Sequence, residues 1–261
     1  MQRAAAFFDL DKTLMAGSSG MQFARVAARQ GIVSRRQLAN WAVEHLRYRL
    51  RGTTDQRTAE VLRVARDLIA GLPEKTIDRM GPEVMAAILP RVFPQMLDEV
   101  HAHQDAGRAT FIVSAAGNGV VESLAHVLGM EGGIGTRYEV NAEGNFTGRF
   151  DGPFVYGAGK VEAMEAFAAE HDVDLAASYA YSDSLSDLPM LRAVGHPVAV
   201  NPDPPLTEIA KQEGWQTMRF ERLGRRLVAV AVTLLATAAG FGGSRIAARR
   251  KTPPRRLHIR Q

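Results

Sequence analysis

Two aspartates, Asp9 and Asp11, lie at the end of a short apolar segment, residues 4–10. A segment of this length and composition is typical of a buried strand of a parallel sheet. Residues two apart in an extended chain face the same side, so both carboxylates would point into the crevice beyond the strand end, with Lys12 pointing the other way. Two such carboxylates can divide the work of group transfer. One acts as an ionised nucleophile, and the other exchanges protons with the leaving group and then with water.

A serine comes directly after a second apolar segment. Residues 109–113 predict another buried strand, and Ser114 follows it in a run of small residues, 115–119. Small residues let backbone amides approach an anion, and the N-terminus of the next helix would favour a phosphate group there. Taken alone, Ser114 is also compatible with a simple helix N-cap.

A second pair of aspartates follows a third predicted strand, residues 178–182. Asp183 and Asp187 are four residues apart, so they share a face if a helical turn begins there. Magnesium is commonly held by one or two carboxylates together with water and substrate phosphate. The pair therefore predicts a magnesium site, although Asp187 by itself is compatible with a turn or capping role.

Four acids at neighbouring strand ends would repel one another unless cations offset their charge. A magnesium ion and Lys160, which precedes or begins a helix predicted over residues 159–170, supply that charge. The arrangement favours in-line transfer of a phosphoryl group to Asp9. Magnesium and Lys160 would stabilise its equatorial oxygens, and Ser114 with nearby backbone amides would hold them.

These residues need a scaffold in which strands alternate with helices. Strands and helices alternate through most of the chain, which indicates an open α/β sheet with right-handed crossovers. After the first strand, however, the chain carries consecutive helical patterns, and these predict a helical insert. The patterns cover residues 18–30, 34–51, 54–70 and 73–89, the last interrupted at Gly81-Pro82, and a further helix is expected over residues 95–106.

Composition excludes several other classes of protein. The chain has 261 residues, 46% of them hydrophobic and 23% charged, which is typical of a globular protein. It has no cysteine, so disulfides, thiolate metal sites and cysteine nucleophiles are excluded. The histidines lack metal-ligand spacing and are expected to be structural or on the surface, with His101 and His103 diverging. The acid Asp9 comes too early for a secretory signal, so we expect a cytoplasmic catalytic part.

The sequence resembles the haloacid dehalogenase-like phosphatases, in the subclass that includes phosphoserine phosphatase. The matching segments are FFDLDKTL, FIVSAAG, the lysine of GAGK and YSDSLSDLPML, in this order across residues 7–191. The resemblance implies Asp9 as nucleophile, Asp11 as general acid/base, Ser114 and Lys160 as phosphate binders, and Asp187 in support. It also implies a magnesium ion held by Asp9, the backbone carbonyl of Asp11, and Asp183.

The resemblance further implies a Rossmann-like open parallel sheet as core, residues 1–14 and 90–218, with a C1-type helical cap, residues 15–89. The cap would close over the site and exclude water during hydrolysis of a phosphomonoester. One departure concerns the substrate. Phosphoserine phosphatases carry an acid nine residues after the nucleophile, positioned for the substrate ammonium, and this chain has Ser18 there. Lysophosphatidic acid or another lipid phosphate is therefore an alternative substrate.

The C-terminal segment, residues 219–261, is strongly basic. It holds eleven Arg and Lys residues and one acid, Glu221, so residues 1–218 carry a net charge of −6. Its uncharged stretch, residues 227–244, would be about 27 Å long as a helix, against a hydrocarbon core of about 30 Å. It could lie on the anionic inner face of a membrane, span the membrane, or pack on its own domain. Nucleic-acid binding is disfavoured because interleaved aromatic residues are lacking.

A membrane-associated binding protein without turnover is the alternative outside enzymes. It would keep the same fold and use the basic segment for attachment. The intact set of Asp9, Asp11, Ser114, Lys160 and Asp183 argues against this alternative, because each of these residues has a role in phosphoryl transfer. The sequence therefore favours an enzyme.

Overall fold

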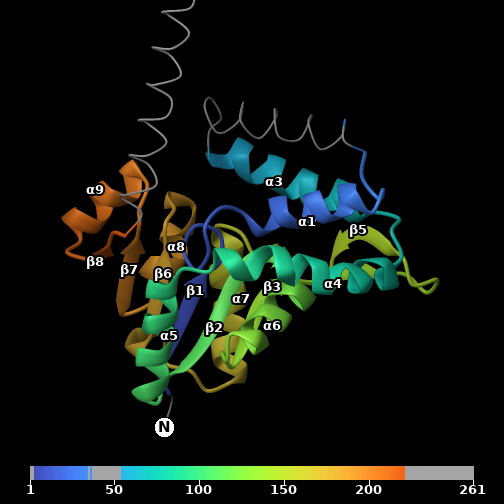
Figure 1. The fold of residues 1–261 in the computed structure, drawn as a ribbon. Helices are drawn as coiled ribbons and strands as arrows, with labels where there is room; N and C mark the ends of the chain where they lie inside the picture. The colour runs from blue at the N-terminus through green and yellow to red at the C-terminus, as the bar shows by residue number, and fades with distance from the viewer. Residues whose placement is uncertain (1–2, 35, 37–53, 221–261) are drawn as a thin grey trace, which may run out of the picture. The chain divides into compact units, whose positions relative to one another are not determined.

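The computed structural model describes residues 3–34, 36 and 54–220. Two compact units are distinguished, Met1–Met218 and Arg219–Gln261. The first unit contains a six-stranded sheet in the order β3-β2-β1-β6-β7-β8, in which all neighbouring strands are parallel (Figure 1). The strands are β1 (Ala5–Asp9), β2 (Ala109–Gly117), β3 (Gly132–Thr136), β6 (Tyr179–Ser182), β7 (His196–Val200) and β8 (Gln216–Met218). The predicted open parallel α/β sheet is confirmed.

The first strand lies inside the sheet, between β2 and β6. All five of its residues are buried, which explains why the segment is apolar until its last residue. Phe7 pairs in register with Phe111 on β2 and Ala180 on β6. The same register places Asp9 opposite Val113, directly before Ser114, so the two predicted site segments reach the same edge of the sheet.

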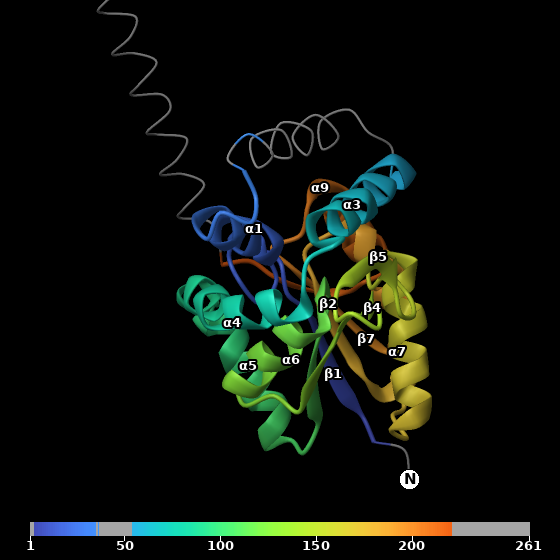
Figure 2. The same ribbon diagram turned by 90° about the vertical axis from the view of Figure 1, so that its right-hand side faces the viewer.

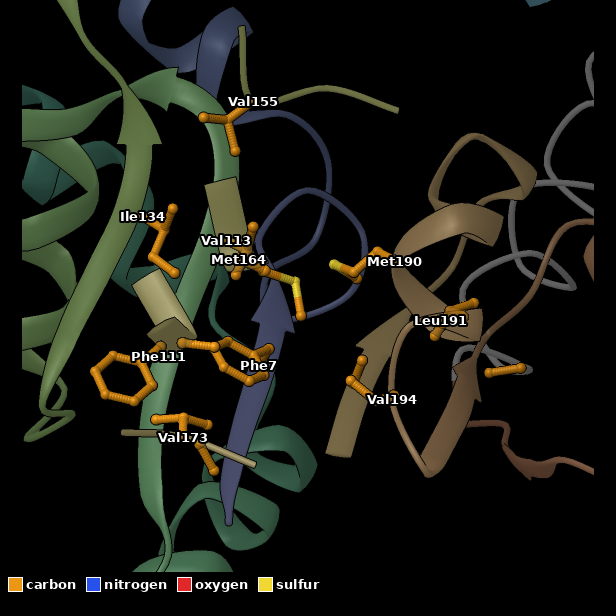
Figure 3. Close-up of a cluster of buried hydrophobic side chains, with 14 of the residues drawn as sticks. Phe7, Phe111, Val113, Ile134, Val155, Met164, Val173, Met190, Leu191 and Val194 are labelled. Carbon is orange, nitrogen blue, oxygen red and sulfur yellow. The ribbon is translucent and has the colours of Figure 1, made fainter. Parts of the chain in front are cut away.

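Helices cover both faces of the sheet (Figure 2). One face packs against α7 (Ala158–Glu170), α8 (Leu188–Arg192) and α9 (Pro204–Gln212) through a cluster of buried side chains. In this cluster Phe7 stacks on Phe111 with ring centroids 5.7 Å apart, beside Met164 of α7 (Figure 3). The other face packs against α5 (Pro94–Asp105) and α6 (Asn118–Val127).

A buried polar network lies where α5 meets the sheet. His103 is buried and His101 is exposed, so the predicted divergence of the two side chains is confirmed. His103 Nδ1 accepts a hydrogen bond from Arg108 Nε at 2.7 Å, and Nε2 lies 2.7 Å from the Tyr181 hydroxyl. Tyr181 donates to Glu99 at 3.2 Å, so its oxygen accepts from His103. The ring of His103 is therefore held neutral, in a structural role.

The predicted insert after β1 is helical. Its described helices are α1 (Ser19–Arg29), α3 (Thr54–Ile69) and α4 (Glu74–Ile88), followed by the short helix η1 (Leu89–Arg91). The helix predicted over residues 34–51 lies almost entirely outside the described residues. The predicted interruption at Gly81-Pro82 is wrong, because α4 continues through Pro82. Both Pro82 and Asp78 are exposed, so water can bond the carbonyl that proline leaves unpaired.

A small antiparallel hairpin, β4 (Tyr138–Val140) and β5 (Phe146–Phe150), is bonded to the turn between α3 and α4. The Gly71 amide donates to the Phe146 carbonyl at 2.8 Å, and the Phe146 amide donates to Leu72 at 2.9 Å. The Glu74 amide donates to Gly144 at 3.0 Å. The hairpin therefore joins the cap at the α3–α4 turn. The two linkers between the cap and the core lie at the opposite side of the cap, where Met15 pairs with Val92.

Candidate active site

Asp9 ends β1 with its carboxylate bonded on both oxygens. Oδ1 lies 2.5 Å from the ammonium of Lys160, and Oδ2 accepts from the Thr13 hydroxyl at 2.9 Å. The residue is only 7% exposed. Burial raises the pKa of Asp9 to about 6 although the Lys160 charge lowers it. Asp9 is therefore mainly ionised at neutral pH, as a nucleophile must be.

Lys160 is buried in the first turn of α7. Its ammonium lies between two carboxylates, Oδ1 of Asp9 and Oδ2 of Asp187, the second at 2.7 Å. Burial alone would lower the pKa of Lys160, but the charges of Asp187 and Asp9 raise it above its usual range. The side chain thus remains a fixed positive charge beside Asp9.

Asp187 is held by groups on both sides. The oxygen that receives Lys160 also accepts from the Ser182 hydroxyl at 2.7 Å, and the residue is 3% exposed. It occupies the N-cap position of α8 without making a side-chain capping bond. Asp187 therefore orients Lys160 rather than serving as a capping residue.

Thr13 links the first and fourth motifs. Its hydroxyl donates to Asp9 and accepts from the backbone amide of Asp183 at 3.0 Å, and the side chain is completely buried. This link holds the carboxyl ends of β1 and β6 together. Thr13 was not among the site residues predicted from the sequence. The sequence feature that could have indicated it is a single polar side chain followed by the apolar residues Leu14 and Met15, both of which are buried.

Asp183 is buried beside other acids. Burial, followed by the charge of Asp9, raises the pKa of Asp183 to about 7, although Lys12 opposes the rise. Lys12 Nζ lies 3.7 Å from Oδ2 of Asp183, so the expectation that Lys12 points away from the site is wrong. The backbone at Lys12 is left-handed, with φ of 63°, and does not continue the extended geometry of β1.

Asp11 faces the beginning of the cap. Its Oδ1 accepts a hydrogen bond from the backbone amide of Ser19 at 2.7 Å, at the first residue of α1. A carboxylate is stabilised in this position by the unpaired amides and the dipole of the helix. The residue predicted to be the general acid/base thus also connects the core to the first cap helix.

Ser114 lies within β2, because that strand continues to Gly117 rather than ending at Val113. It is 4% exposed, and its hydroxyl accepts from the Ala116 amide at 3.2 Å. The N-cap of α6 is Gly117, so the alternative role of Ser114 as a helix N-cap is wrong. The small residues between Ser114 and α6 are available to approach an anion.

The charges suit a magnesium ion. Asp9, Asp183 and Asp187 are buried, whereas Lys160 is the buried cation of this group and Lys12 is half-exposed. No group of three or more imidazole or carboxylate side chains in the described part of the chain is placed to hold a metal ion. Magnesium is nevertheless commonly bound by only one or two carboxylates and keeps several water ligands. The carboxylates of Asp9 and Asp183, together with one backbone carbonyl, fit this pattern.

A comparison with known protein families agrees with this geometry. The sequence model of haloacid dehalogenase-like hydrolases matches residues 6–192, which include every residue of the site. The chain belongs to the haloacid dehalogenase-like hydrolase family. The parallel sheet and the helical insert after β1 are the family's core and C1 cap, and the protein is a phosphatase of the phosphoserine phosphatase-like subclass.

Relatives extend the match over most of the chain. A probable phosphatase of Mycobacterium tuberculosis is 36% identical over 94% of this chain and 86% of its own length. A phosphoserine phosphatase of the same organism is 32% identical over 95% of this chain and 82% of its own length. A histidinol-phosphatase of Neisseria meningitidis is 30% identical over 83% of this chain and 98% of its own length.

A solved structure shows the same fold. A protein of unknown function from Bordetella pertussis superposes with a TM-score of 0.73 at 31% identity, over 84% of this chain and 99% of its own.

The match to the probable phosphatase of M. tuberculosis covers more of the chain than residues 1–218 contain, so it extends into the basic C-terminal segment.

Proposed function

We propose that this phosphatase hydrolyses a phosphomonoester through an aspartyl-phosphate on Asp9. The observation that carries the proposal is the contact of Lys160 with Asp9 and Asp187 in a buried site. The fixed ammonium keeps Asp9 ionised and lies where a phosphoryl oxygen would develop charge. The neighbouring segment from Ser114 to Gly117 supplies a hydroxyl and small residues for the other phosphoryl oxygens.

The reaction has two halves. In the first, a carboxylate oxygen of Asp9 bonds to phosphorus, the bond from phosphorus to the ester oxygen breaks, and Asp11 gives that oxygen a proton. In the second, a water oxygen attacks phosphorus, Asp11 takes a proton from this water, and the carboxylate of Asp9 leaves. Inorganic phosphate and the alcohol are the products, and both aspartates return to their starting states.

Magnesium is the expected cofactor, held by the side chains of Asp9 and Asp183 and by the backbone carbonyl of Asp11. When bound, it would offset negative charge on the phosphoryl group. The raised pKa of Asp183, caused first by burial and then by the charge of Asp9, supports this assignment. A divalent cation would offset both the cost of burying this carboxylate and its repulsion by Asp9.

The substrate is a phosphomonoester whose selection does not depend on a carboxylate at position 18. Ser18 is the N-cap of α1, and its hydroxyl accepts from the Met21 amide at 3.4 Å, so no acid is present there for a substrate ammonium. Relatives of similar identity are named for two different substrates, phosphoserine and histidinol phosphate. Overall identity therefore does not choose between esters, and lysophosphatidic acid remains an alternative substrate.

The direct test is phosphate release from a panel of esters, measured with magnesium and with chelator. The panel spans phosphoserine, histidinol phosphate, sugar phosphates, nucleotides and lysophosphatidic acid. We expect magnesium-dependent release from at least one ester and its loss in Asp9→Asn, with the folding transition of that variant retained. No release by the folded wild-type chain from any ester would favour a binding protein without turnover.

We also propose that residues 219–261 attach the protein to an anionic membrane surface, with the catalytic unit in the cytoplasm. The excess of basic residues around an uncharged stretch supports this proposal. Among the described residues no helix is long and apolar enough to cross a membrane, and residues 227–244 lie outside that part of the chain.

Vesicle sedimentation tests the attachment. The full chain should sediment with vesicles containing phosphatidylserine and remain in solution with neutral phosphatidylcholine vesicles. A chain ending at Met218 should lose sedimentation and keep hydrolysis of a small soluble ester. Equal sedimentation of the two chains would contradict membrane attachment through this segment without affecting the proposed reaction.

A further inference from the structure

Five aromatic rings form a continuous row along the hairpin and the segment that follows it. Neighbouring centroids are 6.0 Å apart from Phe146 to Tyr138, 5.3 Å from Tyr138 to Phe150, 5.1 Å from Phe150 to Phe154, and 6.1 Å from Phe154 to Tyr156. Every one of these residues is partly exposed. We call Tyr138, Phe146, Phe150, Phe154 and Tyr156 the aromatic row.

The row touches the segment that carries Ser114. Tyr138 Cε2 lies 3.6 Å from the position that a Cβ atom would occupy on Gly117. Gly117 ends β2 and is the N-cap of α6, three residues after Ser114. Tyr138 therefore lies against the small-residue segment expected to bind phosphate.

The row also touches the segment that carries Lys160. The carbonyl oxygen of Phe154 lies 2.0 Å from where a Cβ atom of Gly159 would be, so a larger residue cannot replace this glycine without moving the chain. Gly159 immediately precedes Lys160. The backbone of Phe154 thus requires a glycine at position 159, whereas the Tyr138 ring would make only an ordinary van der Waals contact with a Cβ atom at position 117.

The middle ring of the row, Phe150, contacts the cap. The guanidinium carbon of Arg66, on α3, lies 5.0 Å from the centroid of the Phe150 ring. Gly148 of β5 would place a Cβ atom 3.0 Å from that of Ala70. Together with the backbone bonds between the hairpin and the α3–α4 turn, these contacts fix the row to the cap. Members of the row therefore contact both the cap and the phosphate-binding segments.

We propose that the aromatic row receives the leaving group and selects phosphomonoesters whose alcohol carries an aromatic or heteroaromatic ring. This inference rests on the proposed function. A ring placed edge-on or offset against Tyr138 or Phe154 makes favourable aromatic contacts and removes apolar surface from water.

The charges around the row favour a neutral ring over a cation. Arg66 already lies over the face of Phe150, so a cationic leaving group would approach a like charge. Burial raises the pKa of Tyr138 to about 12, so its hydroxyl stays neutral at physiological pH and does not repel a phosphate dianion. The row thus offers apolar ring faces without adding negative charge beside the phosphate.

Two matched esters test the selection. Ethyl phosphate and 2-phenylethyl phosphate are both esters of primary alcohols, and they differ in the ring. We expect the wild-type chain to hydrolyse 2-phenylethyl phosphate with a kcat/KM at least about tenfold higher. In Tyr138→Leu and in Phe154→Leu the ratio of the two kcat/KM values should fall toward one.

Phe167→Leu is the matched control. Phe167 also contacts an aromatic ring, with its centroid 4.7 Å from that of Phe111, but it lies on α7 outside the aromatic row. The ratio of kcat/KM values should stay at the wild-type level in this variant. An equal fall in all three variants would assign the effect to general loosening of the fold and overturn the inference.

Binding to Asp9→Asn separates failure of the inference from failure of the proposed function. Calorimetry should show that 2-phenylethyl phosphate binds this variant at least about tenfold more tightly than ethyl phosphate. Equal affinities would overturn the role of the aromatic row even if the wild-type chain hydrolyses both esters. Preferential binding without turnover of any ester would support the row and contradict the proposed phosphatase reaction.

Discussion

The ammonium of Lys160 lies 2.5 Å from Oδ1 of Asp9 and 2.7 Å from Oδ2 of Asp187, and all three side chains are buried. Lys160→Met would leave both carboxylates without this cation. We expect the free energy of unfolding in urea to fall by about 3–5 kcal/mol, as for other buried pairs from which one partner is removed. Hydrolysis should fall at least about 100-fold, because a charge aimed at the phosphoryl group is lost.

Lys211→Met is the control for this prediction. Lys211 makes an ion pair with Glu208 at 2.9 Å, but both side chains are about two-thirds exposed. Exposed pairs contribute little, so unfolding should change by less than about 1 kcal/mol. Similar losses in the two lysine variants would contradict the structural role given to Lys160.

Thr13→Val tests the contribution of the Thr13 hydroxyl separately from that of the side-chain shape. The substitution removes the donor to Asp9 and the acceptor for the Asp183 amide, while the side-chain volume is nearly kept. Leaving a buried amide unpaired costs about 1–3 kcal/mol in the free energy of unfolding. We expect kcat to fall as well, because Asp9 loses one of its two fixed contacts. Thr13→Ser keeps the hydroxyl and should recover most of both losses.

Asp11 has two separable contributions. Asp11→Asn keeps an oxygen that can accept from the Ser19 amide, so the melting temperature should change little. It removes the group that exchanges protons, so kcat should fall by about 10²- to 10⁴-fold. Asp11→Ala should add a stability loss of about 1 kcal/mol through the lost helix-end contact. Normal turnover by Asp11→Asn would exclude Asp11 as the general acid/base.

His103 should make the fold less stable in acid. Burial, together with the charge of Arg108, lowers the pKa of His103 from 6.5 to about 4 in the folded protein. As pH falls, His103 therefore takes up a proton near pH 6.5 in the unfolded chain but only near pH 4 in the folded protein. The contribution of His103 to the free energy of unfolding falls as pH falls through this window and is constant above it.

The variant His103→Gln isolates this contribution. The raised pKa values of Asp9 and Asp183, caused first by burial, have the opposite effect on stability, so the wild-type curve alone mixes these groups with His103. The difference in unfolding free energy between wild type and His103→Gln should shrink as pH falls from about 6.5 to 4. A difference independent of pH, measured by urea unfolding, would show that His103 titrates normally in the fold.

The strands that end in the site could be predicted because the local sequence determines them. A fully buried parallel strand is largely apolar and carries no charged side chain until its end, so the first charged residue, as at Asp9 or Asp183, marks that end. Strand β3 gives no comparable signal, because three of its five residues are glycines. The structure explains the glycines, since Cβ atoms on Gly133 and Gly135 would lie within 3 Å of α6. Such close packing between elements is not visible in the local sequence.

The contacts within the site depended on tertiary geometry. The position of Lys12 follows from one left-handed residue, for which a lysine gives no local signal. The resemblance implied Asp187 as a support for Asp183, whereas its contacts with Lys160 and Ser182 and the Thr13 link required coordinates. The aromatic row was missed for a similar reason, because its members come together only when β4 and β5 pair as a hairpin.

Because the hairpin is hydrogen-bonded to the α3–α4 turn, the helical insert alone is not a unit that can be exchanged between related proteins. In a chimaera made by splicing the helical insert alone into a related core, the amides of Gly71 and Glu74 and the carbonyl of Leu72 would lose their partners. Residues 138–150 would have to be exchanged at the same time, although α5, β2, α6 and β3 separate the two segments in the sequence. Recombination between relatives should therefore preserve this pair of segments together, and crossovers that divide them should give poorly folding proteins.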